Sequence, residues 1–242
     1  MSTADEAFEE AKKLIEQART NRDSIFRLHF PWAQELEVLP KSIKALKSLE
    51  VLDISGTSVS DLTPLEGMTQ LGDLNISKTK VLSLAPLEGV PFLERLRADF
   101  TDLSTLGELR AIRNVERLFL RGTDIAELPG NLGLEYLVEL DLSFTQIKEL
   151  SPLSELYQLR GLYLAGTQVS DIKPISSLTN LTRIYLDNSR VENMSPLRKL
   201  RKLAILPDFD GLTFRGCRAT ELDSRLDEIS FVKDPAERAT DL

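Results

Sequence analysis

A short pattern of hydrophobic and polar positions recurs along most of the chain. Its clearest mark is a small polar residue, nearly always threonine, that returns every 22 residues. The marks are Thr57, Thr79, Thr101, Thr123, Thr145, Thr167 and Ser189. Self-similarity at a fixed short period indicates a repeat architecture. We therefore expect a fold built from stacked copies of one unit.

The apolar positions keep the same register around each mark. Leu140 and Leu142 precede Thr145, for example, and Ile147 and Leu150 follow it. Five copies then carry a Pro-Leu or Pro-Ile pair, at 64–65, 86–87, 152–153, 174–175 and 196–197. The copies around 106–132 lack this pair, and Pro129-Gly130 replaces the regular turn. A local irregularity is expected there.

Each segment before a mark alternates apolar and polar residues, which predicts a short strand with its leucines on one face. One strand cannot bury that face alone, so stacked copies would form a parallel sheet over a continuous leucine core. A 22-residue period leaves little room for a full return helix, and proline favours a 3-10 turn or an extended segment. Each threonine hydroxyl is expected to hydrogen-bond the buried backbone of its turn.

In one line the unit reads L-x-x-L-x-L-x-x-T-x-V-x-x-L-x-P-L-x-x-L-x-x. This unit resembles the leucine-rich repeat family, in its short 22-residue bacterial, internalin-like form. The resemblance implies an α/β solenoid, a right-handed curved coil with a parallel β-sheet on its concave face. Short 3-10 or extended segments would form the convex face, and helical caps would cover the ends.

Three parts are expected along the chain: an N-terminal helical cap over 1–24, about eight coils of leucine-rich repeats over 25–210, and a C-terminal cap over 211–242. Apolar residues recur at helical spacing in the first part, with Ser2 or Thr3 as N-cap. An earlier, degenerate copy around Leu28 has a spacing that we take as one residue longer. Helix starts at Thr220 and Asp234 leave two interpretations of the C-terminus open: a fragment of a longer chain, or a frayed native end.

Charge and rare residues narrow the function. The chain has 242 residues and a formal net charge of −8, which disfavours a whole-surface attraction to nucleic acid or an anionic membrane. One Cys and one His exclude a disulfide framework and the usual zinc sites, and no cofactor is expected. We expect Cys217 to be a buried thiol and His29 a surface or capping residue. The acidic N-terminus is unlike a secretory signal, so we expect a cytoplasmic location, or delivery into a host cell by a signal-peptide-independent route.

The outward strand positions would line the concave face, where they are available for binding. Aromatic and arginine residues gather there, and both types are enriched at protein interfaces. We predict a partner-binding site made of Phe119, Tyr163, Tyr185, Arg95, Arg97, Arg117, Arg121, Asp141 and Arg183. The aromatic residues would be anchors, and the arginines would meet acidic groups of the partner. Phe100 and Phe144 either extend this surface or pack into the turns.

The function expected is non-enzymatic recognition of a protein or peptide, and other interpretations stay open. In the first alternative, the face is an ordinary charged surface, and the arginines pair within the chain with Asp99, Glu139, Asp141 and Asp187. In the second alternative, the chain is the sensor or targeting part of a larger bacterial effector or immune-type receptor. Stacking on single-stranded nucleic acid and an enzyme with a carboxylate site are both disfavoured, the first by the interleaved acids.

Overall fold

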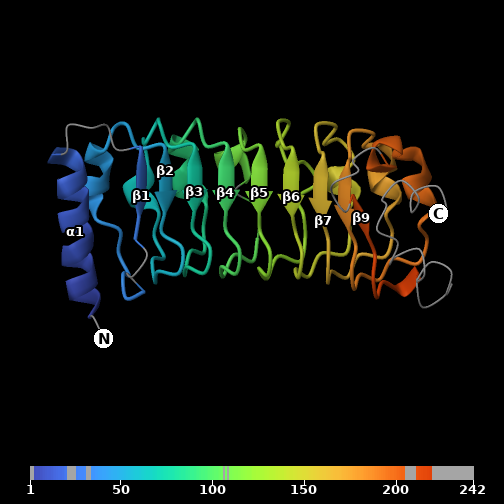
Figure 1. Ribbon diagram of the computed structural model, residues 1–242, viewed down its shortest axis with the longest axis horizontal. Helices are drawn as coiled ribbons and strands as arrows, with labels where there is room; N and C mark the ends of the chain where they lie inside the picture. Colours follow the sequence, from blue (N-terminus) through green and yellow to red (C-terminus); the bar gives the residue numbers. More distant parts are fainter. Residues whose placement is uncertain are drawn as a thin grey trace.

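The computed structural model describes residues 3–20, 26–30, 34–105, 107, 109–204 and 211–219. Within these residues, nine parallel strands form one sheet in chain order, each paired with the next (Figure 1). The strands are β1 (Arg27–His29), β2 (Val51–Asp53), β3 (Asp73–Asn75), β4 (Arg95–Arg97), β5 (Arg117–Phe119), β6 (Glu139–Asp141), β7 (Gly161–Tyr163), β8 (Arg183–Tyr185) and β9 (Leu212–Thr213). The leucine-rich repeat solenoid that the pattern predicts is confirmed.

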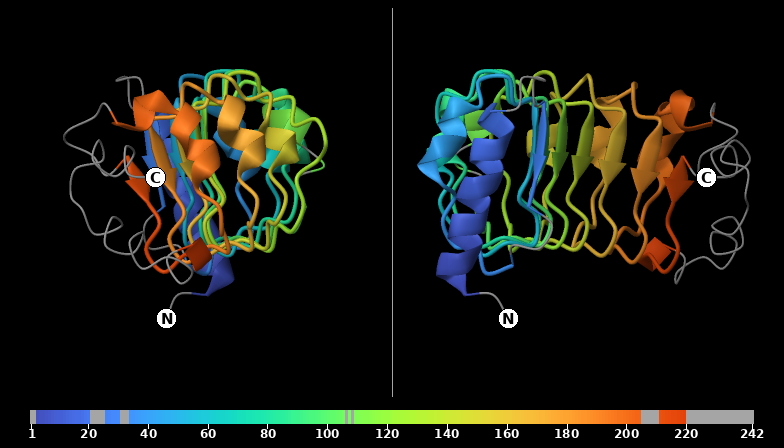
Figure 2. Two further views of the ribbon diagram at one scale, coloured as in Figure 1. Left: turned by 90° about the vertical axis from the view of Figure 1, so that its right-hand side faces the viewer. Right: turned by 60° about the vertical axis from the view of Figure 1, so that its left-hand side comes forward.

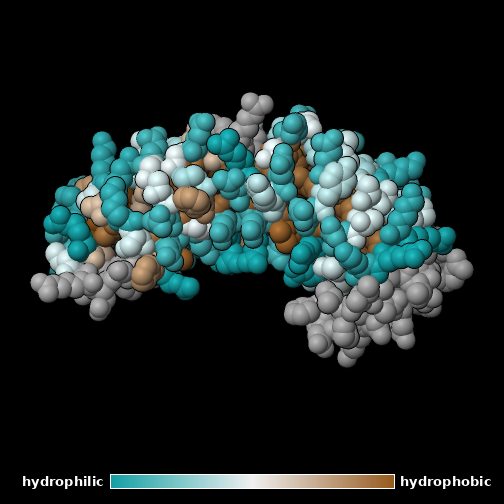
Figure 3. Space-filling model, turned by 90° about the horizontal axis from the view of Figure 1, so that it is seen from above, coloured by the Kyte–Doolittle hydropathy of each residue, from teal (hydrophilic) through white to brown (hydrophobic). Residues whose placement is uncertain are grey.

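The coils lie behind one another when the molecule is seen along its length (Figure 2), and from above the molecule has the outline of a shallow arc (Figure 3). The middle residue of each three-residue strand is buried, as Leu118 is in β5, and joins one continuous core. Burying these side chains is the main stabilising term, at about 25 cal/mol per Å² of apolar surface. The first and third residues of the strands point outward on the sheet face.

Helix α1 (Ala4–Thr20) stands at the N-terminal end, beside the 3-10 helix η1 (Lys41–Ala45) (Figure 1). Its first turn forms a capping box. The Thr3 hydroxyl accepts a hydrogen bond from the Glu6 amide at 3.3 Å, and the Glu6 carboxylate accepts one from the Thr3 amide at 2.9 Å. Its buried face consists of Ala7, Ala11, Ile15 and Ala18. The helix thus covers the open end of the core, as expected of a cap.

The 22-residue step holds from β2 to β8 and fails at both ends. Leu28 pairs with Leu52, a step of 24 residues, so the first spacing is two residues longer and our expectation of one was wrong. Ile184 pairs with Leu212, a step of 28. The sheet therefore continues beyond residue 210, where the repeats were expected to end. Residues 218 and 219 are already helical, so the helix that was expected to start at Thr220 begins before that residue. The expected start at Asp234 lies outside the described residues.

Short 3-10 helices form the return side of most coils. They are η1, η2 (Thr63–Leu65), η3 (Ala85–Gly89), η4 (Leu109–Ile112), η5 (Ser151–Leu153), η6 (Lys173–Ser177), η7 (Ser195–Lys199) and η8 (Arg201–Ala204). Five of them hold a proline in their first turn, as predicted. Residues 120–138 form no 3-10 helix, which is the expected irregularity. A surface hollow of about 520 Å³ opens there, lined in part by Leu132, Pro152 and Tyr157.

The expected hydrogen bonds of the threonines that mark each repeat, here called the threonine ladder, are also confirmed. Six hydroxyls donate to the carbonyl three residues earlier at 2.6–2.8 Å, as Thr145 does to Leu142. All six threonines are buried. Ser189 is the exception, because its buried hydroxyl has no hydrogen-bond partner among the described residues.

Candidate functional site

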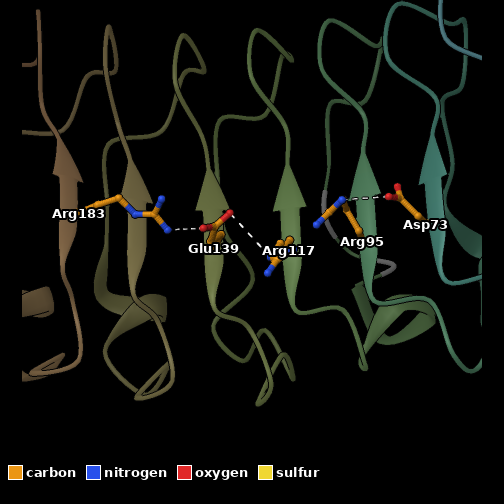
Figure 4. A network of polar contacts seen from close by, with 5 residues as sticks. All are labelled: Asp73, Arg95, Arg117, Glu139 and Arg183. Atoms are coloured by element: carbon orange, nitrogen blue, oxygen red, sulfur yellow. Dashed lines mark hydrogen bonds and ion pairs between the residues drawn. The ribbon is translucent and has the colours of Figure 1, made fainter. Parts of the chain in front are cut away.

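A row of charged side chains crosses the outward face of the sheet at the first strand position (Figure 4). Arg95 on β4 donates to Asp73 on β3 at 3.1 Å. Glu139 on β6 lies between two arginines, with Arg117 Nε at 4.0 Å and the Arg183 guanidinium in direct hydrogen-bond contact. These side chains are partly buried, and Glu139 keeps only 17% of its side chain exposed. Three of the five predicted arginines are thus paired within the chain.

The glycine on β7 explains how Arg183 reaches Glu139. Gly161 occupies the first position of the strand between them, and it is buried. A Cβ atom there would lie 3.3 Å from the Tyr163 ring and 3.5 Å from Glu139 Cγ. Because no side chain blocks β7, the Arg183 side chain crosses it to the carboxylate two coils away. Part of this arrangement was foreseen, since Glu139 was one of the possible internal partners, whereas Asp73 was not.

Two predicted anchors meet on neighbouring strands. The rings of Tyr163 and Tyr185 pack edge to face, with centroids 4.9 Å apart and planes at 83°. Such pairs contribute about 0.5–1.5 kcal/mol beyond the area they bury. Both rings are partly exposed on the sheet face. Burial raises the pKa of the Tyr163 phenol, so it stays neutral and able to donate a hydrogen bond at physiological pH.

Two other arginines stack on aromatic rings of the following coil. Arg97 lies over Phe119, with its Cζ atom 5.8 Å from the ring centroid, and Arg121 lies over Phe144 at 4.4 Å. Arg97 and Arg121 are exposed, and within the described ranges neither makes an ion pair with a carboxylate. The five predicted arginines therefore form two sets: Arg95, Arg117 and Arg183 are paired along the charged row, and Arg97 and Arg121 lie beside aromatic rings.

Phe100 and Phe144 lie at the turn that follows each strand, in left-handed conformation with φ of 55° and 60°. Glycine holds the equivalent position of the next coil. A Cβ at Gly122 would meet the Phe100 ring at 2.5 Å, and one at Gly166 would meet Phe144 at 2.8 Å. Each ring thus rests on a glycine and stays about half exposed, at 50% and 47%. The two phenylalanines both pack into the turns and extend the surface.

The remaining acids of the face serve the turns. Asp141 accepts a hydrogen bond from the Ser143 amide at 2.8 Å, and Asp99 accepts one from the Arg121 amide at 2.9 Å. Asp187 accepts from the Arg215 amide at 2.6 Å. Burial raises the pKa of the Asp99 carboxyl. These bonds hold each carboxylate against the backbone, so they occupy acids that were expected to face a partner or the arginines.

Other candidate chemistry is sparse. Cys217 is fully buried, as expected, and His29 is half-exposed with Nδ1 3.7 Å from an Asp53 oxygen. In the part of the chain that the structure covers, no three His, Cys, Asp or Glu side chains gather in a metal-binding group. No helix among the described residues is long and apolar enough to cross a bilayer.

Sequence and structure comparisons agree with the fold. Residues 157–199 match a family described as leucine-rich repeats (2 copies). Among curated proteins, none matches the chain.

Solved structures share the architecture. An internalin C2 from Listeria monocytogenes is similar over 88% of this chain and 96% of its own, with 23% identity and a TM-score of 0.73. An internalin (inlF) from the same species is similar over 95% and 76%, with 20% identity and a TM-score of 0.67. A leucine-rich repeat protein from Leptospira interrogans is similar over 82% and 51%, with 23% identity and a TM-score of 0.70.

Proposed function

Since this chain folds as a leucine-rich repeat solenoid, we propose that it binds a protein or peptide on its concave sheet and performs no catalysis. The outward positions of the strands are not needed for the core, so they are available for binding. Solenoids commonly use such extended concave surfaces for recognition. The fold alone does not decide a function, so the proposal depends on the side chains of that face.

The observation that carries the proposal is the set of aromatic side chains at the third position of three strands in the C-terminal half of the sheet. Phe119, Tyr163 and Tyr185 are partly exposed on β5, β7 and β8, and the two tyrosines are held by their edge-to-face contact. A side chain that is already ordered loses little entropy when a partner covers it. Tyrosine also offers a large apolar area with a polar tip, which is why it is frequent among binding hot spots.

The test is affinity capture from the native host's lysate with the Tyr163→Ala/Tyr185→Ala variant beside the wild type. We expect a partner that the wild type retains and the variant loses. The matched control is Tyr136→Ala/Tyr157→Ala, which removes two tyrosines that are 60% exposed and lie outside the strands. Circular dichroism checks that all three proteins are folded. Equal capture by the wild type and the sheet variant would contradict the proposal.

A further inference from the structure

We propose that the concave face selects an acidic peptide segment, and that Arg97 and Arg121 are the residues that select it. This inference rests on the proposed function and adds the chemistry of the partner. It starts from a difference among five arginines that look equivalent in the sequence. Arg95, Arg117 and Arg183 each make an ion pair with a carboxylate, whereas Arg97 and Arg121 make none within 4 Å among the described residues and interact with Asp99 only at longer range.

The paired arginines have little charge to offer. Arg95 and Arg183 are partly buried beside Asp73 and Glu139, with 29% and 28% of their side chains exposed. A partner carboxylate would have to displace an existing ion pair to reach either of them. The net gain from such an exchange is small, because one ion pair replaces another.

Arg97 and Arg121 are in the opposite situation. Their Cζ atoms lie 5.8 and 4.4 Å from the ring centroids of Phe119 and Phe144, within the range of a cation–π contact. A guanidinium carries five N–H donors in a planar fork that suits a bidentate carboxylate, and an aromatic ring beside it satisfies none of them with a carboxylate oxygen. Stacking also restricts the side-chain rotamers before a partner binds, which lowers the entropic cost of binding.

Charge distinguishes the occupant. The chain carries a net charge of −8, so two cations without an ion pair among the described residues stand out against an acidic background. Asp99 and Asp141 lie on the same face and are bound to the backbone of the turns. A continuous polyanion such as nucleic acid would meet these acids as well as the arginines. A peptide with a few carboxylates can place each one opposite a guanidinium and avoid them.

The neighbouring rings predict a second feature of the segment. Phe100 and Phe144 are about half exposed at the turns beside these arginines. Their exposed apolar surface is available to apolar side chains that stand next to the acidic residues of a bound peptide. We therefore expect an acidic segment that also carries apolar residues, bound where β4 and β5 run into their turns.

The experiment is a selection of peptides from a random display library on the immobilised full chain. Enriched sequences are synthesised with their acids intact and with Asn and Gln in their place. Both forms are titrated against the wild type, Arg97→Gln/Arg121→Gln, and the control Arg113→Gln/Arg201→Gln. The control removes the same charge from exposed arginines outside the strands.

We expect the enriched peptides to be rich in Asp and Glu, and to bind Arg97→Gln/Arg121→Gln at least about tenfold more weakly than the wild type. The control variant should bind like the wild type, and the amide peptides should bind weakly to all three proteins. Peptides without an acidic bias, equal binding by both double variants, or a library without binders would each overturn the proposal.

Two further measurements separate the possible failures. The selection could enrich peptides without acids that bind the wild type but not Phe119→Ala. That result would overturn the proposal of an acidic segment and leave the proposed concave site intact. Peptides unaffected by any substitution on the sheet face would contradict both. A labelled oligothymidylate is the probe for nucleic acid. If it binds the wild type and competes with the peptides, the preferred ligand is a polyanion and the acidic-peptide proposal fails.

Discussion

The threonine ladder allows a stability prediction with a control inside the same chain. Thr145→Val removes one hydroxyl and keeps the shape of the side chain. That hydroxyl is buried and donates to the Leu142 carbonyl at 2.6 Å. The same carbonyl also accepts the Thr145 amide at 3.3 Å, so it keeps one partner in the variant. A hydrogen bond of this kind contributes about 0.5–1.5 kcal/mol net, and we expect a loss of about 1 kcal/mol.

Ser189→Ala is the matched control, because the Ser189 hydroxyl is buried in the same column without a hydrogen-bond partner among the described residues. Its removal should change the free energy of unfolding by less than about 0.5 kcal/mol or raise it slightly, since an unsatisfied buried hydroxyl is itself unfavourable. Urea unfolding followed by circular dichroism measures both variants. Equal losses in the two, or no loss in Thr145→Val, would refute the view that the bond stabilises the turn.

Three other substitutions test features of the sheet face. Glu139→Gln should cost about 1 kcal/mol at low salt and less at high salt, measured by urea unfolding, because it leaves two arginines without a carboxylate. Gly166→Ala should lower the free energy of unfolding by more than about 1 kcal/mol, because the residue has φ of 67° and the new Cβ would meet the Phe144 ring. The control Gly130→Ala should be nearly neutral, because open space surrounds that position. Asp99→Asn should raise the melting temperature at neutral pH, because the raised pKa of Asp99 means that its ionised form destabilises the fold. The gain should shrink as pH falls through that pKa and vanish below the ordinary value, where the carboxyl is protonated in both states; an unchanged or growing gain would contradict this.

Much of the solenoid follows from the sequence because its determinants are local and repeated. The 22-residue period predicts the pairing of Leu118 with Leu140, and the threonine column predicts the bonds within each turn. Departures from the period were not predictable in the same way. The 28-residue step to Leu212 depends on how one longer connection closes, and no repeat states its length.

The candidate site was predicted less fully than the fold. Outward positions follow from the alternation, so the residues of the face could be named. Their pairing depends on side-chain reach: Arg183 passes over Gly161 to Glu139 in the second coil away. The contact of Arg121 with Phe144 was missed too. Gly122, Gly166 and Asn188 stand at the turn position that Phe144 occupies in its own coil, and residues of these types favour the left-handed backbone found there.

The phenylalanine-on-glycine contacts have a consequence for how the array can change length. Phe100 rests on Gly122 and Phe144 rests on Gly166, so bulky and empty positions alternate from coil to coil. The natural module in this stretch is therefore a pair of coils, 44 residues long, although the sequence repeats every 22. Excising the single coil that contains Gly122 would set Phe144 against Phe100, ring against ring. Excising two neighbouring coils would keep each ring on a glycine, so shortened versions of this protein should be designed in steps of two.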